Sequence, residues 1–135
     1  MGNGIEYPSV ERIVEFNLLA LTLIKMKKGD AHQVLSHSKI REAIEGCRNE
    51  DGDLYKKAVA LLKALVQKHA FASGNRRTAF IAAKSFVLSN GGSFKIADDP
   101  HYARAMQGIR EDYYSDEELM EWIKHGKIRE FKRSI

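Results

Sequence analysis

Apolar residues recur at helical spacing from the segment after Tyr7-Pro8 onward. Ser9 is placed to cap a helix whose broad apolar face ends before Gly29. Because so many apolar side chains fall on one face, we expect this helix to pack against the rest of the protein. Its apolar positions are Val10, Ile13, Val14, Phe16, Leu18, Leu21 and Ile24.

Two more helices are predicted in the next segment of the chain. One begins near Ser38 and stops at residues 49–52, which read Asn-Glu-Asp-Gly. Asp53 is placed to cap the other, which carries His69 at or just past its C-terminal end. The apolar positions are Ile40, Ile44 and Cys47 in the first, and Leu54, Ala58, Val59, Leu61, Leu62, Leu65 and Val66 in the second.

A fourth helix is expected from Gly74-Asn75 to Asn90-Gly91-Gly92, where glycines allow the left-handed backbone that ends helices. A short extended piece over residues 93–97 follows. Asp99-Pro100 then has the form of an N-cap and a first helical residue, which opens a fifth helix through Ile109.

A capping box formed by Ser115 and Glu118 predicts the start of the last helix, and Gly126 is expected to end it. We expect the basic last ten residues to be frayed. Strands and helices do not alternate as they do in parallel sheets, so the predicted fold class is mostly α. A chain of 135 residues fits a single domain.

Composition and charge narrow the classes of function. The net charge of +4 permits an anionic ligand, but no aromatic interleaving or known motif points to nucleic acid. The longest apolar stretch, residues 18–24, is far short of the roughly 20 residues that span a bilayer, so we expect no membrane partner. A single cysteine and the absence of a secretory signal pattern suit the cytoplasm.

The loop between the third and fourth predicted helices carries the candidate chemistry. His69 closes one helix, and Asn75, Arg76 and Arg77 open the next. Gly74 lets consecutive N–H groups point to one place, and the first helical turn adds unpaired N–H donors, so we predict a phosphate site. An imidazole takes up protons near neutral pH, which makes His69 a candidate general base if it faces the same cavity.

Taken singly, these features have commoner structural explanations. A histidine at a helix end is more often a capping group, adjacent arginines usually form a solvated face, and Gly-Asn is an ordinary turn pair. Their order is distinctive, because it resembles the Fic/Doc family motif, His-x-Phe-x-acid-(Gly or Ala)-Asn-(Gly or Lys)-Arg. The matching residues are His69, Phe71, Gly74, Asn75 and Arg77, followed by Thr78 and Ala79.

The resemblance extends over about residues 7–96 and implies a Fic/Doc-like helical bundle with a short β-hairpin flap near residues 31–38. Residues 97–135 would add C-terminal helices and a basic tail to one domain over residues 1–135. The resemblance further implies that His69 is the catalytic base and that Phe71 buries its ring to fix the loop. The residues implied to bind phosphate are Ser73, Gly74, Asn75, Arg76 and Arg77.

Two positions depart from the family pattern. Ser73 replaces the acid that holds Mg²⁺ through the nucleotide phosphates, and a neutral hydroxyl is a poor Mg²⁺ ligand, so this cofactor is left open. Phe80 replaces an arginine typical of adenylyl-transferring members. The Doc phosphotransferase also lacks that arginine, and it has a cation where Arg76 stands. Acids that could substitute from elsewhere are Asp51, Asp53, Asp98 and Asp99.

The resemblance therefore implies a transferase that moves phosphate from ATP, or another nucleoside triphosphate, to a hydroxyl of a target protein. It would act as a death-on-curing type toxin. The alternatives are adenylyl (AMP) transfer by the same fold, and a catalytically impaired module that binds nucleotide or protein. The nearest match to an inhibitory helix, Ser38 to Glu42, is followed by Ala43 rather than Gly or Asn, so restraint would come from an antitoxin partner.

Overall fold

The computed structural model describes residues 4–23 and 32–132. Within them the chain forms helices and no strand, which confirms the mostly α class. The expected end of the first helix over residues 24–29, residue 31 of the expected flap and the last three residues of the tail lie outside the described residues. The helices are α1 (Val10–Leu23), α2 (His37–Asn49), α3 (Leu54–Gln67), α4 (Asn75–Ser89), α5 (Tyr102–Arg110) and α6 (Asp116–His125).

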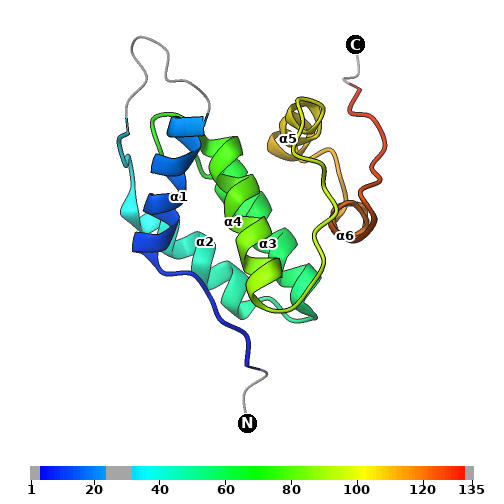
Figure 1. Ribbon diagram of the computed structural model, residues 1–135, viewed down its shortest axis with the longest axis horizontal. Coiled ribbons are helices and arrows are strands. Elements are labelled where there is room, and N and C mark those ends of the chain that lie inside the picture. The colour runs from blue at the N-terminus through cyan, green and yellow to red at the C-terminus, as the bar shows by residue number, and fades with distance from the viewer. Residues whose placement is uncertain (1–3, 24–31, 133–135) are drawn as a thin grey trace.

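Helix α3 lies at the centre of the arrangement (Figure 1). It packs against α4 and α2 on one side and against α5 and α6 on the other, while α1 packs on α4. The sequence explains this position, because the apolar residues of α3 surround much of its circumference. Those buried in the core are Ala58, Val59, Leu61, Leu62, Leu65 and Val66.

Side-chain caps fix where most helices begin. Ser36 caps α2 by accepting a hydrogen bond from the Lys39 N–H at 3.2 Å, so the helix begins at His37, one residue before the predicted start near Ser38. Asp53 caps α3, as predicted, and accepts from two backbone N–H groups of the first turn. The predicted capping box between Ser115 and Glu118 is also present.

The predicted start of α5 is wrong. The helix begins at Tyr102, and its N-cap residue is His101 rather than Asp99. The Asp99 carboxylate accepts the N–H of His101 at 2.8 Å, which closes a local turn instead of the first helical turn. Pro100 therefore lies in this turn and not inside the helix.

The expected β-hairpin flap is not formed by residues 32–38. Val34 makes an isolated antiparallel bridge to Phe71. Around this bridge the Leu35 N–H donates to the Ala70 carbonyl at 2.8 Å, and the Ala72 N–H donates to the Gln33 carbonyl at 3.0 Å. This segment therefore pairs with the loop between α3 and α4 instead of with a strand of its own.

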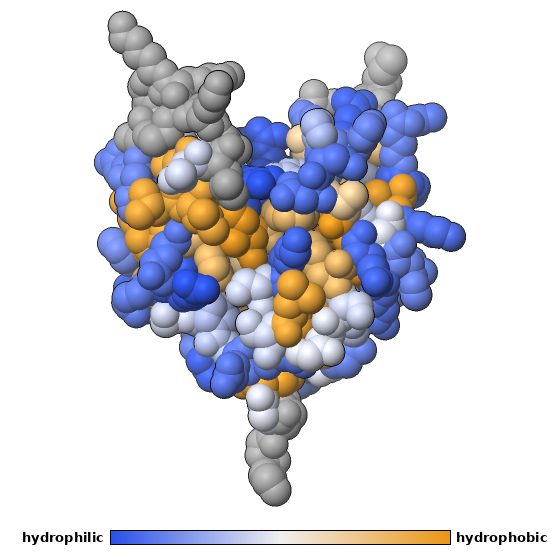
Figure 2. Space-filling view, viewed as in Figure 1, coloured by the Kyte–Doolittle hydropathy of each residue, from blue (hydrophilic) through white to orange (hydrophobic). Residues whose placement is uncertain are grey.

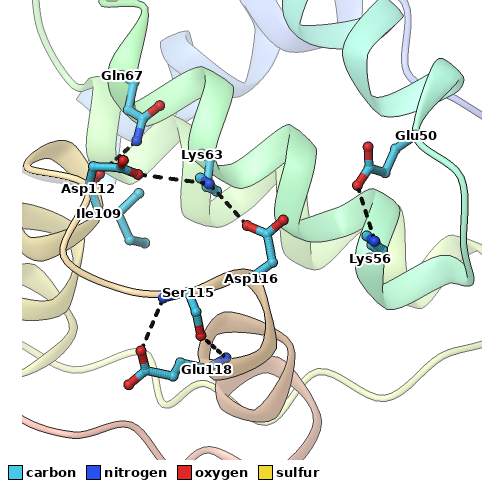
Figure 3. A network of polar contacts seen from close by, with 9 residues as sticks. All are labelled: Glu50, Lys56, Lys63, Gln67, Ile109, Asp112, Ser115, Asp116 and Glu118. Atoms are coloured by element: carbon cyan, nitrogen blue, oxygen red, sulfur yellow. Dashed lines mark hydrogen bonds and ion pairs between the residues drawn. The ribbon is translucent and has the colours of Figure 1, made fainter.

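Polar contacts from α3 hold the two C-terminal helices in place (Figure 3). Near its end, Gln67 donates from Nε2 to the Ile109 carbonyl of α5 at 2.8 Å. One turn earlier, the Lys63 ammonium lies 3.0 Å from Asp116 of α6 and 3.9 Å from Asp112. The end of α5 and the start of α6 are thus tied to consecutive turns of the central helix.

The tail is not frayed over residues 127–132, contrary to expectation. Phe131 is buried, and its ring lies edge-on to Tyr113. Arg129 pairs with Glu118, donates to the Tyr113 carbonyl at 2.9 Å and lies over the Tyr113 ring. Apolar and cationic contacts together hold this end of the chain against α5 and α6, because its basic residues alternate with Ile128 and Phe131.

In the view of Figure 2, apolar residues gather over α1. Leu18 is 52% exposed there, so its predicted place on the buried face of the first helix is wrong. Its neighbour Asn17 is buried instead, which rotates the inward face of α1 relative to the expected pattern. No helix among the described residues is long and apolar enough to cross a membrane.

The contact between Glu118 and Arg129 predicts a pH dependence of stability. Hydrogen bonding to the Arg129 guanidinium lowers the pKa of the Glu118 carboxyl from its ordinary value of 4.5. A lowered native pKa means that the stabilisation is present above the pKa of the unfolded chain and is lost as pH falls through the native value. Glu118→Gln should therefore reduce the free energy of unfolding at neutral pH and reduce its loss below about pH 4.5, measured by urea denaturation.

Glu117→Gln is the matched control, because Glu117 is an exposed acid in the same first turn. It makes the same change in charge near the helix dipole without touching Arg129. Equal pH profiles for the two variants would contradict a stabilising role of the pair.

Candidate active site

Two residues with left-handed backbone shape the loop between α3 and α4. His69 has a φ of 53° and ends α3 in the position where glycine is the common choice. Gly74 has a φ of 79° and precedes the first residue of α4. A Cβ on Gly74 would lie 3.2 Å from Leu21 Cδ2 and 3.3 Å from Asn17 Nδ2, so both backbone angle and space favour glycine.

The Asn75 side chain organises this loop from inside. Its Oδ1 accepts the Phe71 N–H at 3.1 Å, and its Nδ2 donates to the Phe71 carbonyl at 2.8 Å. The same Nδ2 lies 3.3 Å from Nδ1 of His69. One amide therefore connects the start of α4, the middle of the loop and the candidate base. Phe71 is buried, as predicted for a residue that fixes the loop.

These contacts favour one tautomer of the imidazole. The two bonds to Phe71 set which way the Asn75 amide points, so its N–H faces the ring of His69. Nδ1 of His69 is then the acceptor at 3.3 Å, and the ring proton lies on Nε2.

Asn17 is a residue of this site that the sequence reasoning missed. It is fully buried on α1, and its Nδ2 donates to the Ser73 carbonyl at 2.8 Å and to Thr78 Oγ1 at 3.0 Å. Thr78 Oγ1 in turn donates to the Gly74 carbonyl at 2.7 Å. The one sequence signal was a polar residue between the apolar residues Phe16 and Leu18 on a helix predicted to pack inward. Asn17 thus fixes the loop from the side of α1.

Arg77 lies beside the loop with most of its charge already compensated. Its Nη atoms donate to the two oxygens of Asp98 at 2.5 and 3.2 Å, and Nη1 also donates to the Tyr102 hydroxyl at 2.8 Å. The bond to Asp98 raises the pKa of Arg77 above its ordinary value, so the guanidinium stays charged. Its Nε is buried without a hydrogen-bond partner among the described residues.

A cavity of about 410 Å³ opens over this loop, which is within the range of small-molecule sites. All the residues predicted to bind phosphate line it together with His69, while Phe71 lies beneath the loop. Val66 and three residues of α5 complete the wall. The lining residues are Val66, His69, Ala72, Ser73, Gly74, Asn75, Arg76, Arg77, Tyr102, Ala103 and Arg110.

The residues present do not fit a protein-held Mg²⁺ ion. The lining of the cavity contains no aspartate or glutamate, and no group of three metal-binding side chains occurs among the described residues. Asp98 is engaged by Arg77, and Asp99 holds a local turn. Asp53 caps the far end of α3, about 20 Å along the helix from His69, and Asp51 lies just before it. None of these four aspartates therefore lines the cavity beside Ser73.

A family comparison agrees with this geometry. The model of the Fic/DOC family matches residues 14–87, more than half of the chain. The chain belongs to the Fic/DOC family. Membership suggests a transferase of the Fic type. A search of curated proteins finds no match. The Fic/DOC match covers most of α1 and α2–α4, and α5 and α6 lie outside it.

Phe80, which stands at the place of the second arginine in adenylyl-transferring Fic members, is buried in an aromatic stack. Its ring lies 4.7 Å from that of Tyr102 at an angle of 21°, and edge-on to Phe94 at 5.5 Å. The position is only 2% exposed, so it contributes no cation to the cavity. It anchors the first residue of α5 to α4.

The left-handed backbone of His69 predicts a difference in stability between two variants at this position. Glycine adopts this conformation freely, whereas other residues lose roughly 1–2 kcal/mol in it. His69→Gly should therefore have a free energy of unfolding about 1 kcal/mol larger than that of His69→Ala, measured by urea denaturation.

Glu45, an exposed residue inside α2, is the control position. There the order should reverse, with the alanine variant more stable than the glycine variant by about 1 kcal/mol. If His69→Gly is no more stable than His69→Ala, the backbone at this position is not strained.

Proposed function

We propose that this protein is a cytoplasmic transferase that moves the terminal phosphate of ATP, or of another nucleoside triphosphate, to a hydroxyl of a target protein. The observation that carries the proposal is the convergence of His69, the first turn of α4 and Arg76 on one cavity. A toxin restrained by an antitoxin is the biological role that fits best, because the nearest match to an inhibitory helix, Ser38 to Glu42, is followed by Ala43 rather than Gly or Asn.

The proposed step uses groups already in place. The hydroxyl oxygen of the target bonds to the γ-phosphorus, and the bond from this phosphorus to the β,γ-bridging oxygen breaks. The nucleoside diphosphate leaves with the electron pair of that bond. His69 takes the hydroxyl proton at Nε2, once its ring proton has moved to Nδ1 and the contact with Asn75 has opened. The N–H groups of the first turn of α4 stabilise charge on the phosphate oxygens.

The backbone of His69 supports a functional role for its side chain. A residue held in an unfavourable conformation, at a position where glycine would be easier, points to a use for the side chain that offsets the cost. A capping role is less suited to this geometry, because the ring contacts Asn75 across the loop. The imidazole is thus kept at the wall of the cavity.

Transfer of phosphate is favoured over transfer of AMP by the place of Phe80. Burial of this residue leaves α4 without the second arginine that orients the nucleotide tail in adenylyl-transferring members. The second candidate function is a binding module without turnover. It is favoured by Ser73 at the place of the family acid, and by the pairing of Arg77 with Asp98.

Labelled ATP distinguishes phosphate transfer, AMP transfer and binding without turnover. We expect a cell lysate incubated with the protein, ATP labelled at the γ position and Mg²⁺ or Mn²⁺ to show label on a protein, and ATP labelled at the α position to give none. His69→Ala should reduce the labelling by about 10²–10⁴-fold, because a positioned base contributes a factor of this size. His125→Ala, which removes an exposed histidine of α6, is the matched control and should label like the wild type.

Label from the α position would replace the proposal with AMP transfer. No transfer from either position, with ATP still bound in a calorimetric titration, would favour the binding module.

Ser73→Asp tests the missing acid. A carboxylate at this position would give the cavity a Mg²⁺ ligand, and it would repel phosphate when no cation is present. We expect the variant to label its target more strongly than the wild type with Mg²⁺ and to bind ATP more weakly with a chelator. Ser73→Asn adds a similar volume without charge and should show neither effect. Labelling that is unchanged by the aspartate would contradict a shortage of metal ligands at the wild-type site.

A further inference from the structure

Helix α5 supplies a cation to the cavity from outside the part of the chain matched by the family model. Arg110, the last residue of α5, lines the same cavity as His69 and the first turn of α4. It lies well beyond residue 87, where the family match ends. Its presence at the cavity could not be read from the motif.

The charges around the cavity leave two guanidinium groups for a ligand. Arg77 is held by both oxygens of Asp98 and by Tyr102. Arg76 and Arg110 are exposed, and within residues 4–23 and 32–132 neither side chain makes a hydrogen bond or an ion pair. Two cations without counter-ions on one cavity, in a lining that has no carboxylate, favour a ligand with more than one negative charge.

Both ends of α5 are fixed, so the place of Arg110 is determined by the fold. At the first residue, Tyr102 stacks on Phe80 and accepts from Arg77. At the last turn, Ile109 is buried and its carbonyl accepts from Gln67, the final residue of α3. His69 follows Gln67 by two residues. The helix that carries Arg110 and the loop that carries the base are thus tied to the same end of α3.

We propose that Arg110 is a phosphate-binding residue of this cavity, which holds the terminal phosphates of the nucleoside triphosphate from the side of α5. This inference rests on the proposed function, whose nucleotide it positions. Arg110 compensates for the charge that Phe80 does not provide on α4 and that Asp98 withdraws from Arg77. A guanidinium suits this task because its planar donors match phosphate oxygens in pairs.

The test is calorimetric binding of ATP and, separately, of pyrophosphate to the full chain. Arg110→Gln should weaken the binding of both by about 10-fold to 100-fold, the size expected for hydrogen bonds to charged groups. Arg110→Lys should retain part of the affinity. Arg48→Gln makes the same change in charge near the opposite end of α3 and should bind like the wild type.

The outcomes separate this inference from the proposed function. If Arg110→Gln binds both ligands like Arg48→Gln, the inference is overturned while the transferase proposal stands. A loss of stability in Arg110→Gln without a loss of affinity would likewise overturn it, because the residue would then serve only the C-terminal dipole of α5. If the wild type binds pyrophosphate but no nucleotide, the proposed function fails, and the pyrophosphate affinities still decide the role of Arg110. Binding of neither ligand by the wild type overturns both.

Discussion

The loop between α3 and α4 must satisfy its own backbone and still present polar groups to a cavity, and the Asn75 amide makes both conditions compatible. It accepts the N–H of Phe71 and donates to the carbonyl of the same residue. A buried backbone group without a partner costs about 1–3 kcal/mol, so this side chain offsets two such penalties at once. Because it also touches His69, the geometry of the proposed base depends on the same amide.

The outer side of the loop is satisfied by a different part of the chain. The carbonyl of Ala70 and the N–H of Ala72 pair with the backbone of residues 33–36. Asn17 holds the next carbonyl, that of Ser73, from α1. These contacts leave the N–H groups of the first turn of α4, which have no acceptor within the helix, for a ligand. The proposed anion site thus depends on how completely the neighbouring backbone is paired.

Local rules predicted most of the fold because the caps and the apolar periods of this chain agree with each other. Asp53 and the Ser115–Glu118 pair begin helices as their residue types require. The start of α5 was missed because the Asp99 carboxylate closes a turn on His101, an outcome that competes with helix capping in the same residue type. The motif predicted which loop residues meet, because its members lie within nine positions of one another.

The parts of the site that escaped prediction are those that arrive from distant segments. Asn17 and Arg110 are separated from the loop by dozens of residues, and the only local signal for Asn17 is a polar residue in an apolar run. Asp98 was considered only as a substitute acid for Mg²⁺, and its pairing with Arg77 was not predicted. The pairing of Arg77 with Asp98 changes the meaning of the motif itself, because a guanidinium already held by a carboxylate offers less charge to phosphate.

The presence of Phe80 in place of an arginine therefore has to be considered together with α5, the helix against which Phe80 packs. An aromatic ring at this position stacks on Tyr102, and Tyr102 begins α5. The nine residues from Tyr102 to Arg110 carry the helix along one wall of the cavity, about 12 Å at the ordinary helical rise. A residue that removes one cation from α4 thus contributes to placing another on α5. The charge of the cavity is a property of the packed helices and not of the motif alone.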